Sequence, residues 1–137
     1  MNEIEIMRKT KSFAIIGASA REDSYGFKLV MNLTKVGYKV FPINPKYGEI
    51  YGLKTYKSLS EIKEPVENIV FSMSPENNIN ILSQSELPDA YVWFPPECWT
   101  DDLINLATNK NLNFQKDKCP IGTYLKINLK KDSDDRI

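Results

Sequence analysis

Two glycines that could let the backbone bind a phosphate group lie at the end of the first apolar run of the chain, in FAIIGASAREDSYG at positions 13–26. Gly17 ends the apolar run, and Gly26 stands where a helical pattern begins. Glycine lets the backbone approach a ligand closely, as the dinucleotide fingerprint G-x-G-x-x-G requires. The match to that fingerprint is poor, because Ala18 and Ser19 follow Gly17 and no second glycine comes before Gly26. The turn either packs a strand against a helix or holds a phosphate by another arrangement.

Three polar residues between the two glycines favour phosphate binding. Ser19 and Ser24 offer hydroxyl groups, and Arg21 offers a cation for charge-assisted hydrogen bonds. Both serines are equally suited to cap a helix, and a single surface cation is usually only solvated. The position of the loop, after the first strand of an alternating pattern, is where α/β domains bind ligands.

The second predicted strand ends in FPINPK, with Asn44, Pro45 and Lys46 at its end. A dinucleotide-binding unit would carry Asp or Glu here for the ribose hydroxyls. Lys46 is the nearest charged side chain, so a phosphorylated ribose suits this position better than a free one.

Composition excludes several classes of function. The 137 residues include no histidine, so Ser-His-Asp and Cys-His pairs and phosphohistidine are excluded. Cys98 and Cys119 cannot build a four-thiolate zinc site, and each is expected to be an inert core residue. Eighteen basic and eighteen acidic residues balance, so we expect no nucleic-acid or membrane partner. With no apolar run near 18 residues and no secretory leader, we expect a cytoplasmic protein.

Short apolar runs alternate with helical patterns along the chain. Strands are expected at 13–16, 39–43, 68–73, 90–94 and 112–115, and helices at 25–36, after Ser58, after Ser74-Pro75 and after Thr100. Such alternation predicts a three-layer, doubly wound Rossmann-like α/β domain with a parallel five-stranded sheet. We expect one domain over residues 1–137, with its core at about 12–127 and a charged, frayed tail at 130–137.

The order of several short motifs resembles the CoA-binding domain family. These motifs are Gly17-Ala18-Ser19, Tyr25-Gly26, Gly37-Tyr38, Ile43-Asn44-Pro45-Lys46, Ile50-Tyr51-Gly52, Tyr56-x-Ser58-Leu59 and a late Cys119. Members of the family are small cytoplasmic proteins similar to the first domain of the succinyl-CoA synthetase alpha subunit. The resemblance covers roughly residues 13–127.

The resemblance implies a coenzyme A site at the strand ends. Its residues would be Gly17, Ala18, Ser19, Arg21, Ser24, Tyr25, Gly26, Asn44, Pro45, Lys46, Ser72, Ser74 and Pro75. The first loop and the helix after it would offer N–H groups to the phosphates, Arg21 and Lys46 would supply charge, and residues 72–75 would form a wall along the pantetheine arm. The family usually has Pro-Gly after its fourth strand. Here Pro96 and Glu97 stand instead, and we expect them to disfavour the positive φ that glycine allows.

We therefore expect a non-catalytic protein that binds CoA or an acyl-CoA. One alternative on the same fold is an NADP-dependent redox enzyme or a nucleotide-sensing protein. Another is an interaction module with a vestigial site, which predicts an exposed aromatic patch at residues 93–99. Self-association into a homo-oligomer is compatible with the seven tyrosines and two tryptophans.

Overall fold

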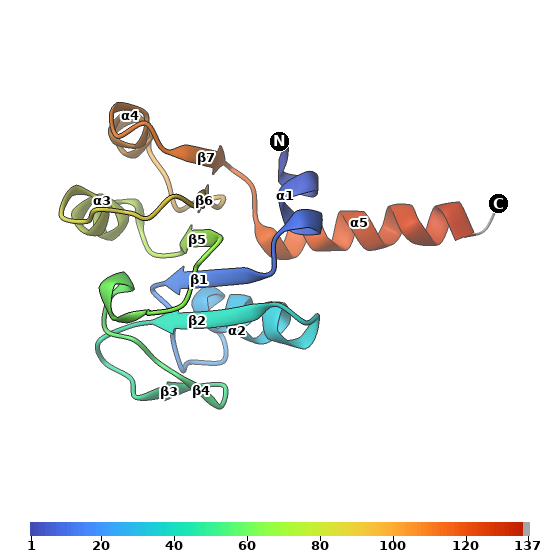
Figure 1. Cartoon of the computed structure of the whole chain (residues 1–137), viewed down its shortest axis with the longest axis horizontal. Helices are drawn as coiled ribbons and strands as arrows, with labels where there is room; N and C mark the ends of the chain where they lie inside the picture. The colour runs from blue at the N-terminus through green and yellow to red at the C-terminus, as the bar shows by residue number, and fades with distance from the viewer. Residues whose placement is uncertain (136–137) are drawn as a thin grey trace.

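A computed structural model describes the backbone of residues 1–135 and the side chains of residues 1–128. Its main sheet contains five parallel strands in the order β2-β1-β5-β6-β7 (Figure 1). The strands are β1 (Ser12–Ile16), β2 (Lys39–Ile43), β5 (Asn68–Phe71), β6 (Tyr91–Phe94) and β7 (Asn113–Lys116). The predicted fold class is confirmed, and all five predicted strands are present with bounds shifted by two residues or fewer.

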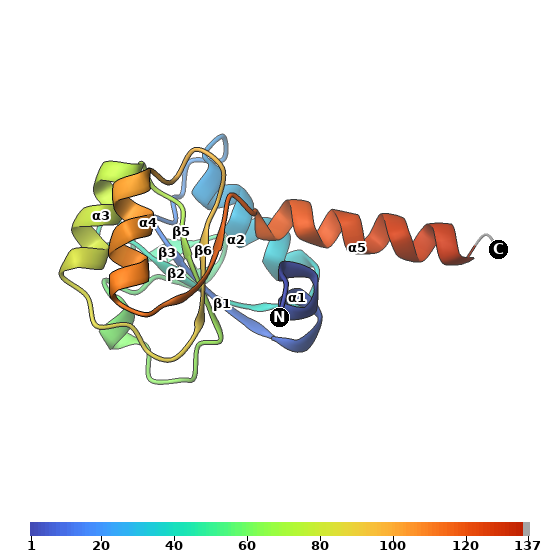
Figure 2. The same cartoon turned by 90° about the horizontal axis from the view of Figure 1, so that it is seen from above.

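Alternate residues of β1, β2, β5 and β6 point into two separate cores, one on each face of the sheet. On β1, Phe13 and Ile15 pack with helices α1 (Glu3–Lys9), α2 (Tyr25–Lys35) and α5 (Pro120–Asp135). Ala14 and Ile16 pack with α3 (Pro75–Ser83) and α4 (Asp101–Asn109) on the other face. Figure 2 shows α3 and α4 on one side of the sheet and α1, α2 and α5 on the opposite side. Burial on both faces explains why β1 is a continuous apolar run instead of an alternating one.

Capping residues fix the starts of three predicted helices. The side chains of Ser24, Ser74 and Thr100 accept hydrogen bonds from the first turns of α2 (Tyr25–Lys35), α3 (Pro75–Ser83) and α4 (Asp101–Asn109). Gly37 ends α2 with φ of 104°, and the N–H groups of Gly37 and Tyr38 bond back to Thr34 and Leu33. This is the Schellman arrangement that a glycine after a helix favours.

Two helices are additions to the predicted pattern. Helix α1 (Glu3–Lys9) is capped by Asn2 and buries Ile6 and Met7. Helix α5 (Pro120–Asp135) continues through most of the segment predicted to be a frayed tail, so that prediction is wrong for the backbone up to Asp135. Residues 136–137 and the side chains from 129 onward lie outside the described residues.

The segment after β2 also differs from the predicted loop. It contains a two-residue hairpin, β3 (Glu49–Ile50) and β4 (Leu53–Lys54), with positive φ at Tyr51 and Gly52 in the turn. The helix predicted after Ser58 is one 3₁₀ turn, η1 (Leu59–Glu61), and Ser58 does not cap it. Among residues 1–135, no helix is long and apolar enough to cross a membrane.

Candidate functional site

The order of the strands changes direction at β1, because the chain adds β2 on one side of β1 and then adds β5 on the other side. The loops after β1 and β5 both lie at the carboxyl ends of the parallel strands. β2 lies on one side of β1 and β5 on the other, which is the position where doubly wound sheets bind ligands. The main-chain N–H of Ser72 and its hydroxyl both donate to the Ile16 carbonyl, at 3.1 and 2.7 Å. Ser72 therefore fixes the ends of β1 and β5 to each other.

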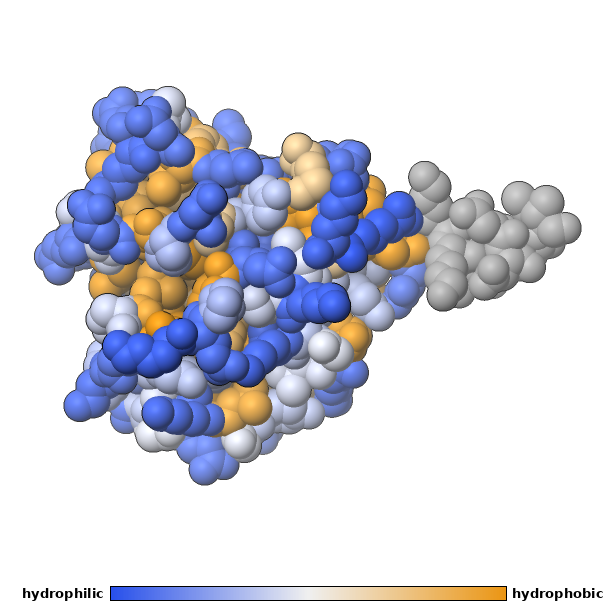
Figure 3. Space-filling view, viewed as in Figure 1, coloured by the Kyte–Doolittle hydropathy of each residue, from blue (hydrophilic) through white to orange (hydrophobic). Residues whose placement is uncertain are grey.

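Two clefts open at this edge. The basic cleft, about 620 Å³, is lined by Ile16, Gly17, Ile43, Asn44, Pro45, Lys46, Lys57, Ser58, Leu59, Met73, Asn77, Asn80, Ile81, Gln84 and Ser85. The thiol cleft, about 420 Å³, is lined by Tyr25, Ser72, Met73, Ser74, Pro96, Glu97, Cys98 and Cys119. Met73 lines both clefts, so they adjoin at its side chain. In Figure 3, apolar surface lies between polar side chains over the half of the molecule that holds α3 and α4.

Close packing accounts for both glycines of the first loop. Gly17 has φ of 88°, and a β-carbon there would lie 2.2 Å from the Met73 Cγ. A β-carbon on Gly26 would lie 2.5 Å from the Gly17 carbonyl oxygen. The pair lets the first turn of α2 lie directly against the end of β1. The resulting tight turn places the start of α2 beside the sheet edge.

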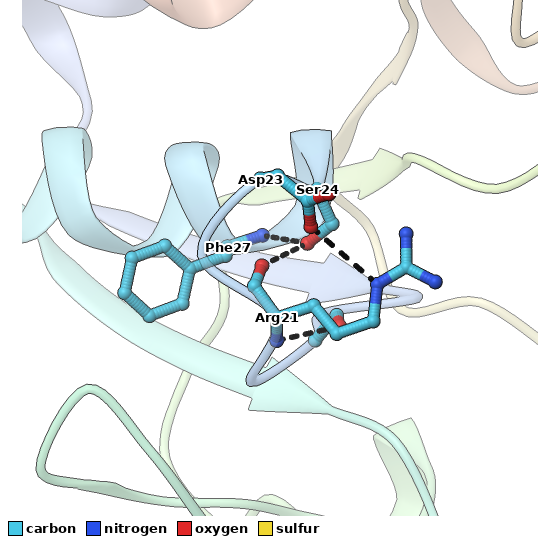
Figure 4. A network of polar contacts seen from close by, with 5 residues as sticks. Arg21, Asp23, Ser24 and Phe27 are labelled. Carbon is cyan, nitrogen blue, oxygen red and sulfur yellow. Dashed lines mark hydrogen bonds and ion pairs between the residues drawn. The ribbon is translucent and has the colours of Figure 1, made fainter.

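The polar side chains of the first loop are engaged with its own backbone (Figure 4). The Ser24 hydroxyl accepts from the Phe27 N–H at 3.1 Å and donates to the Arg21 carbonyl at 2.7 Å. Ser19 Oγ accepts from the Arg21 N–H at 3.1 Å. The Arg21 guanidinium, 73% exposed, lies 3.6 Å from Asp23. Ser24 is thus a cap whose hydroxyl both donates and accepts. The donors of this loop that could meet a ligand are the Ser19 hydroxyl, the Arg21 guanidinium and main-chain N–H groups in the first turn of α2.

Asn44 joins the loops after β1 and β2. Its Nδ2 donates to the Ala18 carbonyl at 2.8 Å, and its Oδ1 accepts from the Lys46 N–H at 2.9 Å. The Lys46 side chain lines the basic cleft together with Lys57. Neither Asp nor Glu is among the residues lining this cleft, so its fixed charges are both positive.

Asn78 fixes the loops that form the walls of the thiol cleft. It is fully buried on α3, and its Nδ2 donates to the carbonyls of Met73 and Cys98, both at 2.9 Å. The Cys98 N–H bonds to the Pro95 carbonyl and closes a turn in which Glu97 has φ of 68°. The expectation that Pro96 and Glu97 avoid positive φ is therefore wrong for Glu97. Its backbone adopts the conformation that glycine takes at the third position of a type II turn.

The two cysteines and a tyrosine meet in the thiol cleft. The Tyr25 hydroxyl donates to the Cys119 Sγ at 2.8 Å. Burial raises the pKa of Tyr25 well above its ordinary value, and the neighbouring Cys119 raises it further. Burial also raises the pKa of Cys98 to about 11, with smaller contributions from Cys119 and Glu97. Tyr25 and Cys98 therefore stay protonated at neutral pH.

The predicted site residues divide into three groups. Gly17, Asn44, Pro45 and Lys46 line the basic cleft, and Tyr25, Ser72 and Ser74 line the thiol cleft. Ala18, Ser19, Arg21, Ser24, Gly26 and Pro75 are not among the residues lining either cleft. These six shape or cap the loops that carry the others.

Sequence reasoning missed several residues that line the clefts or position them. Lys57, Asn77, Asn80, Gln84 and Ser85 line the basic cleft, and Asn78 holds the walls of the thiol cleft. Lys57 lies inside the Tyr56-x-Ser58 motif, which was the available signal. Two of the three aromatic residues in the segment predicted as an exposed patch at 93–99, Trp93 and Phe94, are fully buried, and the Trp93 Nε1 donates to Asn68 Oδ1 at 3.0 Å. The third, Trp99, is half-buried, so the segment does not form an exposed aromatic patch.

Comparisons with known proteins agree with the fold described above. A model of the family described as "CoA binding domain" matches residues 11–124. The chain is 42% identical over 65 residues to an ADP-forming acetate–CoA ligase of Methanocaldococcus jannaschii, covering 47% of this chain but only 9% of that enzyme. It is 33% identical over 73 residues to the protein YneT of Bacillus subtilis, covering 53% of this chain and 54% of YneT. A Pyrococcus horikoshii structure superposes with a TM-score of 0.81 at 24% identity, covering 92% of both chains, which shows the shared fold.

Proposed function

The chain belongs to the CoA binding domain family, and from this premise we propose that it binds coenzyme A or an acyl-CoA across the two clefts. The nucleotide and its phosphates would occupy the basic cleft, and the pantetheine arm would extend past Met73 into the thiol cleft. The observation that carries this proposal is the adjoining pair of clefts at the switch point, one with two lysines and the other with thiols. The functional groups of CoA are arranged in the same way, with phosphates at one end of the molecule and a thiol at the other.

Charge supports the placement of the phosphates. Lys46 and Lys57 line the larger cleft without a neighbouring carboxylate among its lining residues. The N-terminus of α2, whose first residue Tyr25 lines the adjoining thiol cleft, would offer main-chain N–H groups and the positive end of its dipole where the ligand passes Met73. Arg21, on the exposed first loop, remains a predicted phosphate contact, since its guanidinium is 73% exposed and its ion-pair partner, Asp23, is exposed as well.

We propose binding without catalysis by this chain alone. The basic cleft offers amides, hydroxyls and two ammonium groups, which bind a nucleotide but supply no general base near neutral pH. The matching segment of the M. jannaschii ligase is a small part of that enzyme, so the ligase reaction is not carried over to this chain. The comparisons support CoA and give no support to NADP. We place the protein in the cytoplasm, where its free cysteines would stay reduced.

Calorimetric titration of the full chain tests this proposal, with CoA, dephospho-CoA, ADP and NADPH compared at equal concentrations. We expect CoA to bind more tightly than the other three, because it alone combines the 3′-phosphate with the pantetheine arm. In a thermal scan, ligand at about 100 times its Kd should stabilise the fold by about 2.7 kcal/mol. Tighter binding of NADPH than of CoA, or no binding of CoA, would contradict the proposal.

Lysine variants localise the binding. Lys46→Gln and Lys57→Gln should each weaken CoA about threefold to tenfold, or ~0.6–1.4 kcal/mol, because each removes one cation near phosphate. Lys35→Gln is the matched control, since Lys35 is exposed in the last turn of α2 and lines neither cleft. Equal affinity in all three variants would show that the phosphates bind elsewhere.

A further inference from the structure

Cys119 is the more accessible of the two thiols in the thiol cleft. It is half-buried, it lines the cleft, and its Sγ accepts a hydrogen bond from the Tyr25 hydroxyl at 2.8 Å. Its carbonyl accepts from the Thr123 N–H at 2.9 Å, and it directly precedes Pro120, the first residue of α5. The Tyr25 hydroxyl and the start of α5 therefore hold this sulfur at the wall of the cleft.

Cys98 lines the same cleft but has a different environment. Its side chain is only 6% exposed, and burial holds its pKa at about 11. A protonated thiol is a poor nucleophile. The cleft therefore contains two thiols of unequal reactivity, and the more accessible one is Cys119.

We propose that Cys119 forms a mixed disulfide with the thiol end of the ligand that occupies the thiol cleft. The inference rests on the proposed function, because a ligand with its phosphates in the basic cleft would direct its free thiol past Met73 into this cleft. Neither the family match nor the relatives assign a covalent role to this residue.

The step is a thiol–disulfide exchange whose oxidant is the symmetrical disulfide of the ligand thiol. The Cys119 thiolate attacks one sulfur of that disulfide, and a Cys119–ligand S–S bond forms as the ligand–ligand S–S bond breaks. The second ligand molecule leaves as a thiolate and takes a proton from water. A free thiol in excess reverses the exchange and returns Cys119 to its reduced state.

Intact-mass spectrometry of the reduced full chain, mixed with CoA disulfide, tests the proposal. We expect one adduct of one CoA less two hydrogens, mapped to the peptide that contains Cys119. Cystamine is the matched reagent without a nucleotide, and CoA disulfide should react at least about tenfold faster, because binding raises its effective concentration beside the thiol. Cys119→Ser should form no adduct, and Lys35→Gln, at a residue that lines neither cleft, should react like the unaltered protein.

Tyr25→Phe tests the hydrogen bond to the sulfur. The mixed disulfide between Cys119 and CoA should form more slowly in this variant, because the donor that holds the sulfur at the wall of the thiol cleft is lost. An unchanged rate with CoA disulfide would show that the Tyr25 hydroxyl does not position this sulfur.

Binding of desulfo-CoA, which lacks the thiol, separates the two proposals. Stabilisation by desulfo-CoA without any adduct from CoA disulfide would overturn the covalent role and leave CoA binding intact. Absence of stabilisation, with equal rates for cystamine and CoA disulfide, would overturn both. An adduct on Cys98 instead of Cys119 would overturn the assignment of the reacting sulfur.

Discussion

Asn78→Ala should destabilise the fold strongly, because one buried amide holds two loops. The Asn78 Nδ2 makes two 2.9 Å hydrogen bonds, to Met73 O and Cys98 O, and a longer one of 3.3 Å to Phe71 O. Its Oδ1 accepts from the Met73 N–H at 3.3 Å. Two well-formed bonds at about 1 kcal/mol each, with about 1–2 kcal/mol for a carbonyl left buried and unpaired, give a loss of about 3–4 kcal/mol.

Urea unfolding followed by circular dichroism measures this loss. With a slope of about 2 kcal/mol per molar urea, the midpoint should fall by about 1.5–2 M. Asn80→Ala is the matched control, because Asn80 is exposed on the same helix and the same change there should cost less than about 0.5 kcal/mol. Losses that are equal for the two variants, or a loss below 1 kcal/mol for Asn78→Ala, would refute the assignment of Asn78 as the link between the loops.

Two further predictions concern the turn after β6. Glu97→Gly should raise the free energy of unfolding by about 1 kcal/mol, because Glu97 has φ of 68°, a conformation that strains every residue with a β-carbon. Glu97→Ala keeps the β-carbon and should not have this effect. Equal midpoints for the two variants in urea would count against strain at this residue. The pKa of Cys98 is raised to about 11 from its ordinary value of 9.0, so the folded state retains this proton while the unfolded chain loses it. The stabilising contribution is complete below pH 9 and is lost as pH rises toward 11, so Cys98→Ala should show a shallower decline in unfolding free energy over that range than the unaltered protein.

Strands β1, β2, β5 and β6 could be predicted because each is a short, mostly apolar run between turn residues. Strand β7 (NFQK) lies at the edge of the sheet with exposed ends, and its Phe114 packs against one core. Helix α1 was missed because its EIEIMRK sequence alternates charged and apolar residues at its start. For α5, the spacing of Ile121, Tyr124 and Ile127 was an available signal, since these side chains pack on the same core. The β3–β4 hairpin has two-residue strands, which are too short for any periodic pattern.

Residues that line the clefts were predictable where they directly follow a strand, and less predictable where they come from a segment distant in the sequence. Asn44, Pro45 and Lys46 directly follow β2, and Ser72 follows β5. Lys57 comes to the same cleft because Tyr56 pairs beside the end of β2, with its N–H bonded to Pro42 O and its carbonyl accepting from Asn44 N–H, both at 2.9 Å. Such pairing between separate segments leaves little trace in local sequence.

The first loop also bears on how its sequence can change over evolution. Its serine hydroxyls already satisfy its own backbone, and its glycines make room for β1, α2 and Met73. Any anion held there would meet main-chain N–H groups, which every residue except proline supplies. Side chains in the loop are then free to drift as long as the backbone path is kept. The side-chain requirements of the turn then rest on Gly17, Gly26 and the capping Ser24, so FAIIGASAREDSYG can depart from the glycine fingerprint and still form the same tight turn.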